Sequence, residues 1–522
     1  MHNDNKTNKL IENSFSYKQR CKAIWKNLLN QKEDYSFPMI VRLETSLSVD
    51  EEIRELNNEE DIEKKHDKYN RIVEFSVLTK EIYDYDRETI LNEFTDQIPE
   101  WTGDYHPFFV SFFVEVNENS KHIIDSLEYQ WYKARFIPNN PREAINNELI
   151  QDVTTEESSL DAMLFFSANS VKNRYGKLQI LSDEPFFRKV KPNRFVLNHY
   201  KPDHFPVASD GAVGGTLNGI WNDDAIKKVD LYNIGHGNAD YIKGKKKRLL
   251  FDIGYDRNNL YRYYLGIGSY PYPKARRAIN RMKPSAVIVS HWDTDHFMGY
   301  IFANPRILDL QWVAPTLVHP GKDMKFSISA FRLAAFLIHK GNLLLVNRTG
   351  IQHNVATLSC GGSNYLIQLK MGGDSGLPQD ISKPGITLRN REGLYLEFFY
   401  KNKLHTLLGA DVPYNSMERT IDLSQLMLMH VPHHCSNMRL MQLTGRTLRN
   451  KKDAYAIICT SVKDDGGVKI YEDYFAHRNE LDRMFGHDNV WHTLFPKHNI
   501  NRNRLIRVKY DDYGNIIVSD YV

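Results

Sequence analysis

The segment His291-Trp292-Asp293-Thr294-Asp295-His296 constrains this chain more than any other, because it places four potential metal ligands within six residues. It follows the apolar run 286–289, which is typical of a buried β-strand. Alternate residues of an extended chain share a face, so His291 and Asp293 point the same way. The last two ligands converge with them only if the chain turns sharply. Two imidazoles and two carboxylates at a strand end suit Zn²⁺ or Mn²⁺. The alternative is a polar loop that caps the strand with solvated carboxylates.

The composition is that of an ordinary globular protein. The chain has 522 residues, of which 41% are hydrophobic and 25% are charged, which predicts about two to four domains. The first residues are polar and lack the apolar segment of a secretory signal. No run is long and apolar enough to span a membrane. The four cysteines lie far apart and form no CxxC pair. We therefore expect a cytoplasmic protein with no membrane partner.

Charge is unevenly distributed along the chain. Residues 1–200 carry 26 Lys and Arg against 35 Asp and Glu, a net charge of −9, whereas residues 201–522 carry 42 against 30, a net charge of +12. The possible metal ligands lie in the basic part, which favours a polyanionic substrate there. The alternative interpretation is an acidic domain that docks on a basic one.

The patterns predict three parts. Residues 1–205 mix helical and strand-like periodicity, which indicates an α+β domain. We find no catalytic motif in it, but it is large enough to bind an unidentified protein partner. Residues 206–227 are rich in glycine and are interpreted as a linker. Residues 228–522 alternate short apolar strands with helices, which indicates an α/β domain.

Two later segments repeat the pattern of a strand followed at once by possible ligands. The apolar run 404–409 leads into Ala410-Asp411, and the run 426–432 leads into His433-His434-Cys435-Ser436. With these, the chain resembles the metallo-β-lactamase superfamily, most closely the ComEC-type domain at the C-terminus of the bacterial competence channel. That branch shows a DVGQGD-like turn, HxDxDH, a Gly-Asp strand end and PHHGS. The counterparts here are residues 233–238, 291–296, 409–411 and 432–436.

The resemblance covers roughly residues 228–510 and implies a four-layer αβ/βα sandwich with two divalent metal ions, Zn²⁺ or Mn²⁺, at one edge. It implies that His291 and Asp293 hold one ion and that Asp411 bridges the two. For the second ion it implies Asp295 and His296, completed by His433 or His434, of which His433 is preferred. Asp293 stands where many relatives have histidine, and this carboxylate makes Mn²⁺ more plausible beside Zn²⁺.

This sequence departs from the family pattern at several positions. Asn233 replaces an aspartate that orients a ligand, and it contributes no charge. His236 replaces a glutamine; it could approach the metals, or it could be an ordinary turn histidine. A further histidine ligand of the wider superfamily has no clear counterpart, and His319 is the best candidate. Cys435 replaces a glycine; it is either a ligand or, as we prefer, a buried cysteine that packs beside the site.

The resemblance implies a metal-dependent hydrolase, with a nuclease or phosphodiesterase as the leading interpretation. Asp295 and Asp411 would orient the attacking water. A basic turn that includes Lys245 and Lys246, and an aromatic-basic stretch that includes Arg276 and Arg277, could contact nucleic acid. Both segments could equally be solvated or packed on the fold. The alternatives are a hydrolase of a small phosphodiester, thioester or lactone, and a non-catalytic regulatory module.

Overall fold

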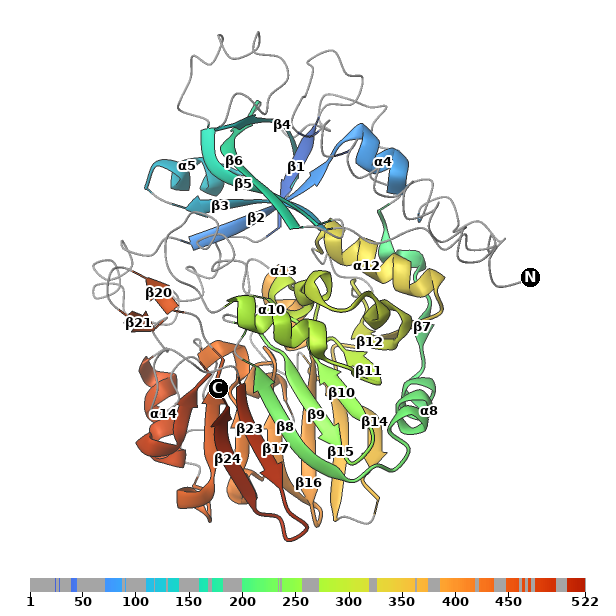
Figure 1. Cartoon of the computed structure of the whole chain (residues 1–522), viewed down its shortest axis with the longest axis vertical. Helices are drawn as coiled ribbons and strands as arrows, with labels where there is room; N and C mark the ends of the chain where they lie inside the picture. Colours follow the sequence, from blue (N-terminus) through green and yellow to red (C-terminus); the bar gives the residue numbers. More distant parts are fainter. Residues whose placement is uncertain are drawn as a thin grey trace, which may run out of the picture. The chain divides into compact units, whose positions relative to one another are not determined.

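In the computed structural model, the chain forms two units. Unit 1 comprises residues 1–204 and 327–340, and unit 2 comprises residues 205–326 and 341–522 (Figure 1). The structure describes residues 24, 28, 39–44, 71–86, 90, 109–116, 118–127, 130–139, 159–167, 171–181, 200–232, 234, 237–255, 272–318, 326–361, 364–373, 385–417, 422–435, 447–459, 462–464, 468–470, 475–493 and 505–521.

Unit 1 is built on a closed antiparallel barrel. Its strands, in spatial order, are β1 (Ile40–Leu43), β2 (Arg71–Leu78), β3 (Phe109–Val116), β5 (Ser159–Ser167), β6 (Val171–Ile180) and β4 (Trp131–Pro138), which pairs again with β1. Helices α4 (Lys80–Asp86) and α5 (Glu118–Ser126) follow β2 and β3. Aromatic side chains such as Phe112 and Phe136, whose rings lie 4.9 Å apart, fill its core. Strand periodicity predicts β1, β2 and β3 from sequence, but the closure of the sheet is not predicted.

Helix α12 (Ile328–His339) belongs to unit 1, although its sequence lies between two strands of unit 2. The Nε atom of Arg332 lies 2.8 Å from Oδ2 of Asp86, and the Tyr200 hydroxyl donates to the same oxygen at 2.5 Å. All three side chains are buried. Burial raises the pKa of Asp86, and the Arg332 guanidinium opposes that rise. The buried ion pair between Arg332 and Asp86 therefore anchors α12 within unit 1, out of contact with water.

Unit 2 contains two large mixed sheets. The first has the order β24 (Ile516–Tyr521), β23 (Leu505–Tyr510), β8 (Ile226–Tyr232), β9 (Asp240–Gly244), β10 (Arg248–Phe251), β11 (Ala286–Ile288), β12 (Gln311–Pro315), β13 (Leu343–Val346) and β7 (Val207–Ala208). The second has the order β14 (His353–Ser359), β15 (Tyr365–Met371), β16 (Leu394–Tyr400), β17 (Lys403–Leu408), β18 (Leu428–His430), β19 (Tyr455–Ile458) and β22 (Val490–His492). A small hairpin, β20 (Val462–Asp464) and β21 (Val468–Ile470), stands apart.

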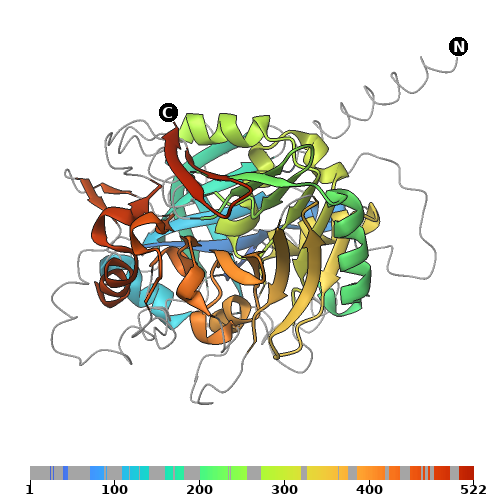
Figure 2. The same ribbon diagram turned by 90° about the horizontal axis from the view of Figure 1, so that it is seen from below.

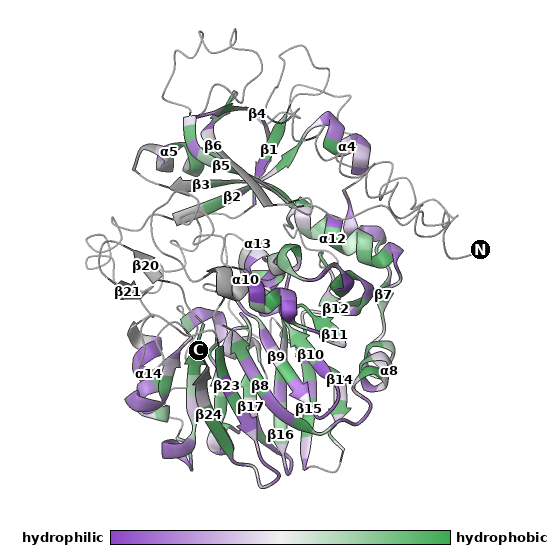
Figure 3. Ribbon diagram, in the orientation of Figure 1, coloured by the Kyte–Doolittle hydropathy of each residue, from purple (hydrophilic) through white to green (hydrophobic). Residues whose placement is uncertain are grey.

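The two sheets share one hydrophobic core. Buried side chains of β10 and β11 join those of β16 and β19 in a single cluster, so the sheets pack face to face (Figure 2). Strands β10 and β11 are coloured mainly as hydrophobic in Figure 3. Helix α14 (Phe475–Phe485) packs with the second sheet through a further buried cluster that includes Leu481 and Met484. The other α-helices in the described part of unit 2 are α8 (Asp210–Trp221), α10 (Tyr272–Arg281), α11 (Thr294–Phe297) and α13 (Gly385–Arg391). Unit 2 is thus an α/β fold.

The segment 206–227, predicted as a linker, is instead ordered into β7 and α8. Ser209 caps the helix by accepting a hydrogen bond from the Ala212 backbone N–H at 3.2 Å. Val213, Leu217 and Trp221 recur every four residues and are fully buried. Glycine is a weak helix former, which is why the glycine-rich sequence suggests a loop. Burial of this apolar face against β14 outweighs that preference. In the part of the chain that the structure describes, no helix is long and apolar enough to cross a membrane.

Replacement of Arg332 with Met is expected to destabilise the protein by about 3 kcal/mol, because Asp86 loses its cationic partner in a buried site. The double variant Asp86→Leu/Arg332→Met should recover much of this loss, since a buried ion pair exchanged for apolar side chains is often nearly neutral. Urea unfolding of the full chain, followed by tryptophan fluorescence, measures both effects. Equal losses in the single and double variants would contradict the proposed anchoring pair.

Candidate metal centre

The possible ligands come from strand ends of both sheets of unit 2. In the first sheet, β10, β11 and β12 are parallel, and His291 follows β11. In the second sheet, β17, β18 and β19 are parallel; Asp411 follows β17, and His434 follows β18. Carboxyl ends of neighbouring parallel strands lie at one edge of a sheet. The predicted ligands therefore meet where the strands β11, β17 and β18 end.

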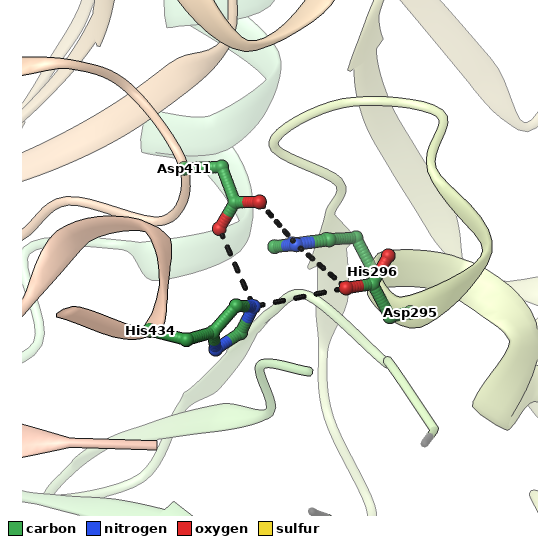
Figure 4. Close-up of side chains that lie close together, drawn as sticks. All are labelled: Asp295, His296, Asp411 and His434. Carbon is green, nitrogen blue, oxygen red and sulfur yellow. Dashed lines mark ion pairs between the residues drawn. The ribbon is translucent and has the colours of Figure 1, made fainter. Parts of the chain in front are cut away.

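Four of these side chains converge on one point. One donor atom from each of Asp295, His296, Asp411 and His434 lies within 4.8 Å of the other three (Figure 4). Oδ2 of Asp411 lies 3.3 Å from Nε2 of His296, and Oδ1 of Asp411 lies 3.6 Å from Nε2 of His434. Oδ2 of Asp295 lies 3.7 Å from the same His434 nitrogen. Two carboxylates and two imidazoles at these separations are a donor set that fits Zn²⁺ or Mn²⁺.

Three further predicted ligands surround this group. Nε2 of His291 lies 3.3 Å from Oδ2 of Asp293 and 3.8 Å from Oδ2 of Asp411. Nε2 of His433 lies 3.7 Å from the same Asp411 oxygen. Asp411 thus lies between two sets of donors, as the bridging role implies. The structure also corrects one preference: His434, and not His433, belongs to the converging group.

Three of the imidazoles are oriented through their other ring nitrogen. Nδ1 of His296 lies 2.8 Å from Oδ2 of Asp252, and Nδ1 of His434 lies 3.0 Å from the backbone oxygen of Cys459. Nδ1 of His291 lies 3.0 Å from Oγ of Ser290. A carboxylate or carbonyl beside Nδ1 fixes the hydrogen there, so Nε2 presents its lone pair to the site. This arrangement is usual for histidines that bind metals.

The electrostatic environment favours a cation at this point. The Nε2 atoms of His291 and His296 are buried and form no hydrogen bond with any described residue. Burial alone would lower the pKa of His296, but Asp411, Asp252 and Asp295 raise it well above its usual value. Burial would raise the pKa of Asp411, whereas His296, His433 and His434 hold it well below its usual value. Buried, ionised carboxylates that face imidazole nitrogens are the environment in which a divalent ion is stable.

The backbone is strained where it delivers these side chains. Asp252, Ala410, His433 and His434 have φ values of 60°, 45°, 49° and 55°. The left-handed region costs an L-residue roughly 1–2 kcal/mol. Such residues persist where the surrounding structure determines the conformation, and they are concentrated at functional sites. The left-handed turn after β18 explains why two adjacent histidines both reach Asp411, which an extended chain would not allow.

Close backbone packing also fixes the segment that carries Asp295. A Cβ atom at Gly254 would lie 1.7 Å from the backbone oxygen of Asp295, and one at Gly237 would lie 2.5 Å from the same oxygen. Only glycine permits this approach. The segment that carries Asp295 is therefore held against two neighbouring loops of unit 2.

Asp293 has a second partner that the sequence did not reveal. Nη1 of Arg389, in α13, lies 2.9 Å from Oδ1 of Asp293. Burial would raise the pKa of Asp293, but Arg389 and His291 together lower it to about 2. Asp293 is therefore ionised at neutral pH, and Arg389 compensates part of its charge.

Several supporting residues were not predicted. Asp252 and Ser290 hold the histidines of the first sheet, and Ser290 Oγ donates to Oδ2 of Asp252 at 2.8 Å. Beside His434, Nδ1 of His430 lies 2.7 Å from Oδ2 of Asp240, and its Nε2 lies 3.0 Å from Sγ of Cys459. Burial raises the pKa of Asp240. In the sequence, Asp252 and Asp240 each lie next to apolar strand residues. This position is a weak sign that the carboxylate is buried and has a partner.

Three predicted residues, Asn233, His236 and His319, lie outside the described residues. Lys245 and Lys246 are exposed in the turn between β9 and β10, at the end of β10 opposite Asp252. The Asp224 carboxylate accepts hydrogen bonds from the backbone N–H groups of Lys246 and Lys247 in this turn.

Three further candidates lie on other elements of unit 2. Arg276 and Arg277 lie on α10, where Arg277 is exposed and the side chain of Arg276 is outside the description. Cys435 is fully buried and packs in the core cluster of the second sheet.

No protein-family model matches the sequence, and no curated protein matches it. Among solved structures, the metallo-beta-lactamase fold protein YhfI of Bacillus subtilis aligns at 12% identity and a TM-score of 0.25, covering 51% of this chain and 95% of that one. A Thermotoga maritima protein provisionally described as a metallo-beta-lactamase aligns at 14% identity and a TM-score of 0.18, covering 33% of this chain and 67% of that one. A variant of the CmlA beta-hydroxylase aligns at 15% identity and a TM-score of 0.18. The alignment covers 35% of this chain and only 30% of that one. At these values the similarity does not define a family.

Replacement of Asp252 with Asn is expected to weaken metal binding 10- to 100-fold, because the amide no longer holds Nδ1 of His296 as a carboxylate does. Competition with a chromogenic chelator measures the affinity of the metal-stripped protein. Asp224→Asn is the matched control, since this carboxylate accepts backbone hydrogen bonds at the far end of β10. An Asp252→Asn protein that binds metal like the parent would contradict the orienting role.

Proposed function

We propose that this chain is a metal-dependent hydrolase that cleaves phosphodiester bonds, with nucleic acid as its substrate. We also propose that unit 2 is a metallo-β-lactamase four-layer αβ/βα sandwich of the ComEC type. The observation that carries the proposal is the convergence of Asp295, His296, Asp411 and His434 within 4.8 Å of one another. These four occupy the positions that the motif resemblance assigns to ligands.

The donor set supports a centre for two divalent ions. Asp295, His296 and His434 would hold one ion, and His291, Asp293 and His433 would hold the other, with Asp411 shared. The oxygen and nitrogen donors suit Zn²⁺ and Mn²⁺ alike. Bound ions of this kind supply Lewis-acid activation of water and of the phosphoryl group at neutral pH.

The chain's own residues contribute orientation and hydrogen-bond acceptance. Asp411 is buried and its pKa is held well below its usual value, so its carboxylate remains an acceptor at neutral pH. Asp295 is partly exposed and lies 3.8 Å from Nε2 of His296. An acceptor that faces both solvent and the ligands is suited to orient an attacking water. The hydrogen bonds to Nδ1 of the histidines prevent rotation of the rings during the reaction.

A polyanionic substrate agrees with the charge of the chain. Residues 201–522, which carry the site, have a net charge of +12. A positive field of this kind draws phosphate polymers toward the protein and makes binding sensitive to salt. Some of the basic residues have structural roles; Arg507, for example, pairs with the buried Asp230 at 2.5 Å. Arg277 is exposed on α10 and remains a candidate contact.

We expect the full chain to cleave end-labelled single- or double-stranded DNA or RNA when Mn²⁺, Mg²⁺ or Zn²⁺ is added to metal-stripped protein. The variants His296→Ala, Asp411→Ala and His434→Ala should lose measurable cleavage, because each removes a converging donor. Gel electrophoresis of the products identifies the polymer that is cut. Raising the salt concentration should reduce cleavage steeply.

The variant Asp224→Asn is the control for these losses. Asp224 accepts backbone hydrogen bonds in the β9–β10 turn, away from Asp252, so cleavage should persist. Protein that holds metal but cuts no polymer would contradict the nuclease proposal and would direct attention to a small phosphodiester, thioester or lactone. Protein that binds no metal would contradict catalysis itself.

A further inference from the structure

The two sets of donors around Asp411 differ in their charged neighbours. Asp293 pairs with Arg389 at 2.9 Å, and the side chains are 21% and 5% exposed. Asp411 instead faces imidazoles, and it forms no ion pair with any described lysine or arginine. A guanidinium keeps its charge throughout the physiological pH range. One donor set therefore contains a fixed cation in contact with its carboxylate.

Arg389 is held rigidly in this position. The buried guanidinium of Arg348 donates from Nη1 to the backbone oxygens of Arg389 at 3.3 Å and Glu392 at 2.7 Å, and from Nε to that of Thr316 at 2.7 Å. These bonds tie the C-terminus of α13 to the loop after β12. The backbone N–H of Leu394 then donates to the oxygen of Ser290 at 2.8 Å, directly before His291. These contacts fix the backbone that carries Arg389 beside the site.

We infer that Arg389 makes the ion position at His291 and Asp293 much weaker than the position at Asp295, His296 and His434. This inference rests on the two-ion centre proposed above. The guanidinium occupies one oxygen of Asp293 and repels a second cation at close range, where the low dielectric strengthens the repulsion. The chain therefore holds one resident ion, and the second ion exchanges with solvent.

The unequal positions have a consequence for substrate binding. A bound phosphate group adds negative charge beside Asp293, whose own negative charge is offset by Arg389. The second ion then binds more tightly in the presence of a phosphate ligand, and the ligand binds more tightly in the presence of the second ion. Arg389 is thus a positioning residue that links occupancy of the weaker ion position to the arrival of an anionic substrate.

Titration of the metal-stripped full chain with Mn²⁺, with free ion measured by electron paramagnetic resonance, tests the inference. The parent protein should bind in two steps, the second at least about tenfold weaker. Arg389→Gln removes the charge but keeps hydrogen-bond donors, so the second step should strengthen about tenfold while the first is unchanged. Arg389→Lys keeps the charge and should resemble the parent. Inorganic phosphate should strengthen the second step in the parent more than in Arg389→Gln.

Asp293→Asn provides an independent variant, which should abolish the second step and preserve the first. Two equal steps in the parent, or the same isotherm for the parent and Arg389→Gln, would overturn the inference. So would an Arg389→Lys protein that binds like Arg389→Gln. The readout is ion binding, so a chain that shows the unequal steps and cleaves nothing contradicts only the proposed reaction. A chain that binds no ion contradicts both.

Discussion

The position of the Asp411 carboxylate among four imidazoles is the constraint on which the site depends. Its oxygens lie 3.3–3.8 Å from Nε2 atoms of His291, His296, His433 and His434. Groups of this kind are costly to bury unless a cation satisfies them. The two sheets must therefore bring their parallel strand ends close enough for these side chains to meet. The hydrophobic core that the sheets share holds them in this arrangement.

The stability of the two-sheet core supports a strained backbone at its edge. Left-handed residues at the ends of β10, β17 and β18 oppose folding locally. Each costs on the order of 1–3 kcal/mol. The same strain makes the ligand positions rigid, because the side chains cannot relax without displacing strands in the core. Rigid donors suit an ion with fixed geometry better than mobile donors on a loop.

The candidate ligands of unit 2 stand out in the sequence because they come in short segments that follow apolar strands, and both features are local. The partners of the buried histidines are not local: Asp252 lies 44 residues from His296, and Asp240 lies 190 residues from His430. A single aspartate beside a strand does not indicate which residue it will meet. The choice of His434 over His433 depends on a left-handed turn that neither histidine predicts. The glycine-rich α8 is missed because tertiary packing outweighs its low helix propensity.

The chain path also limits how the protein can be divided. Helix α12 lies in sequence between β12 and β13, two paired strands of unit 2, yet its side chains pack in unit 1. Phe331 contacts Tyr200, and Arg332 contacts Asp86, both within unit 1. Removal of residues 1–204 would expose Arg332 and the apolar face around Phe331 to water. The domain that carries the candidate site is therefore not a contiguous segment of the chain.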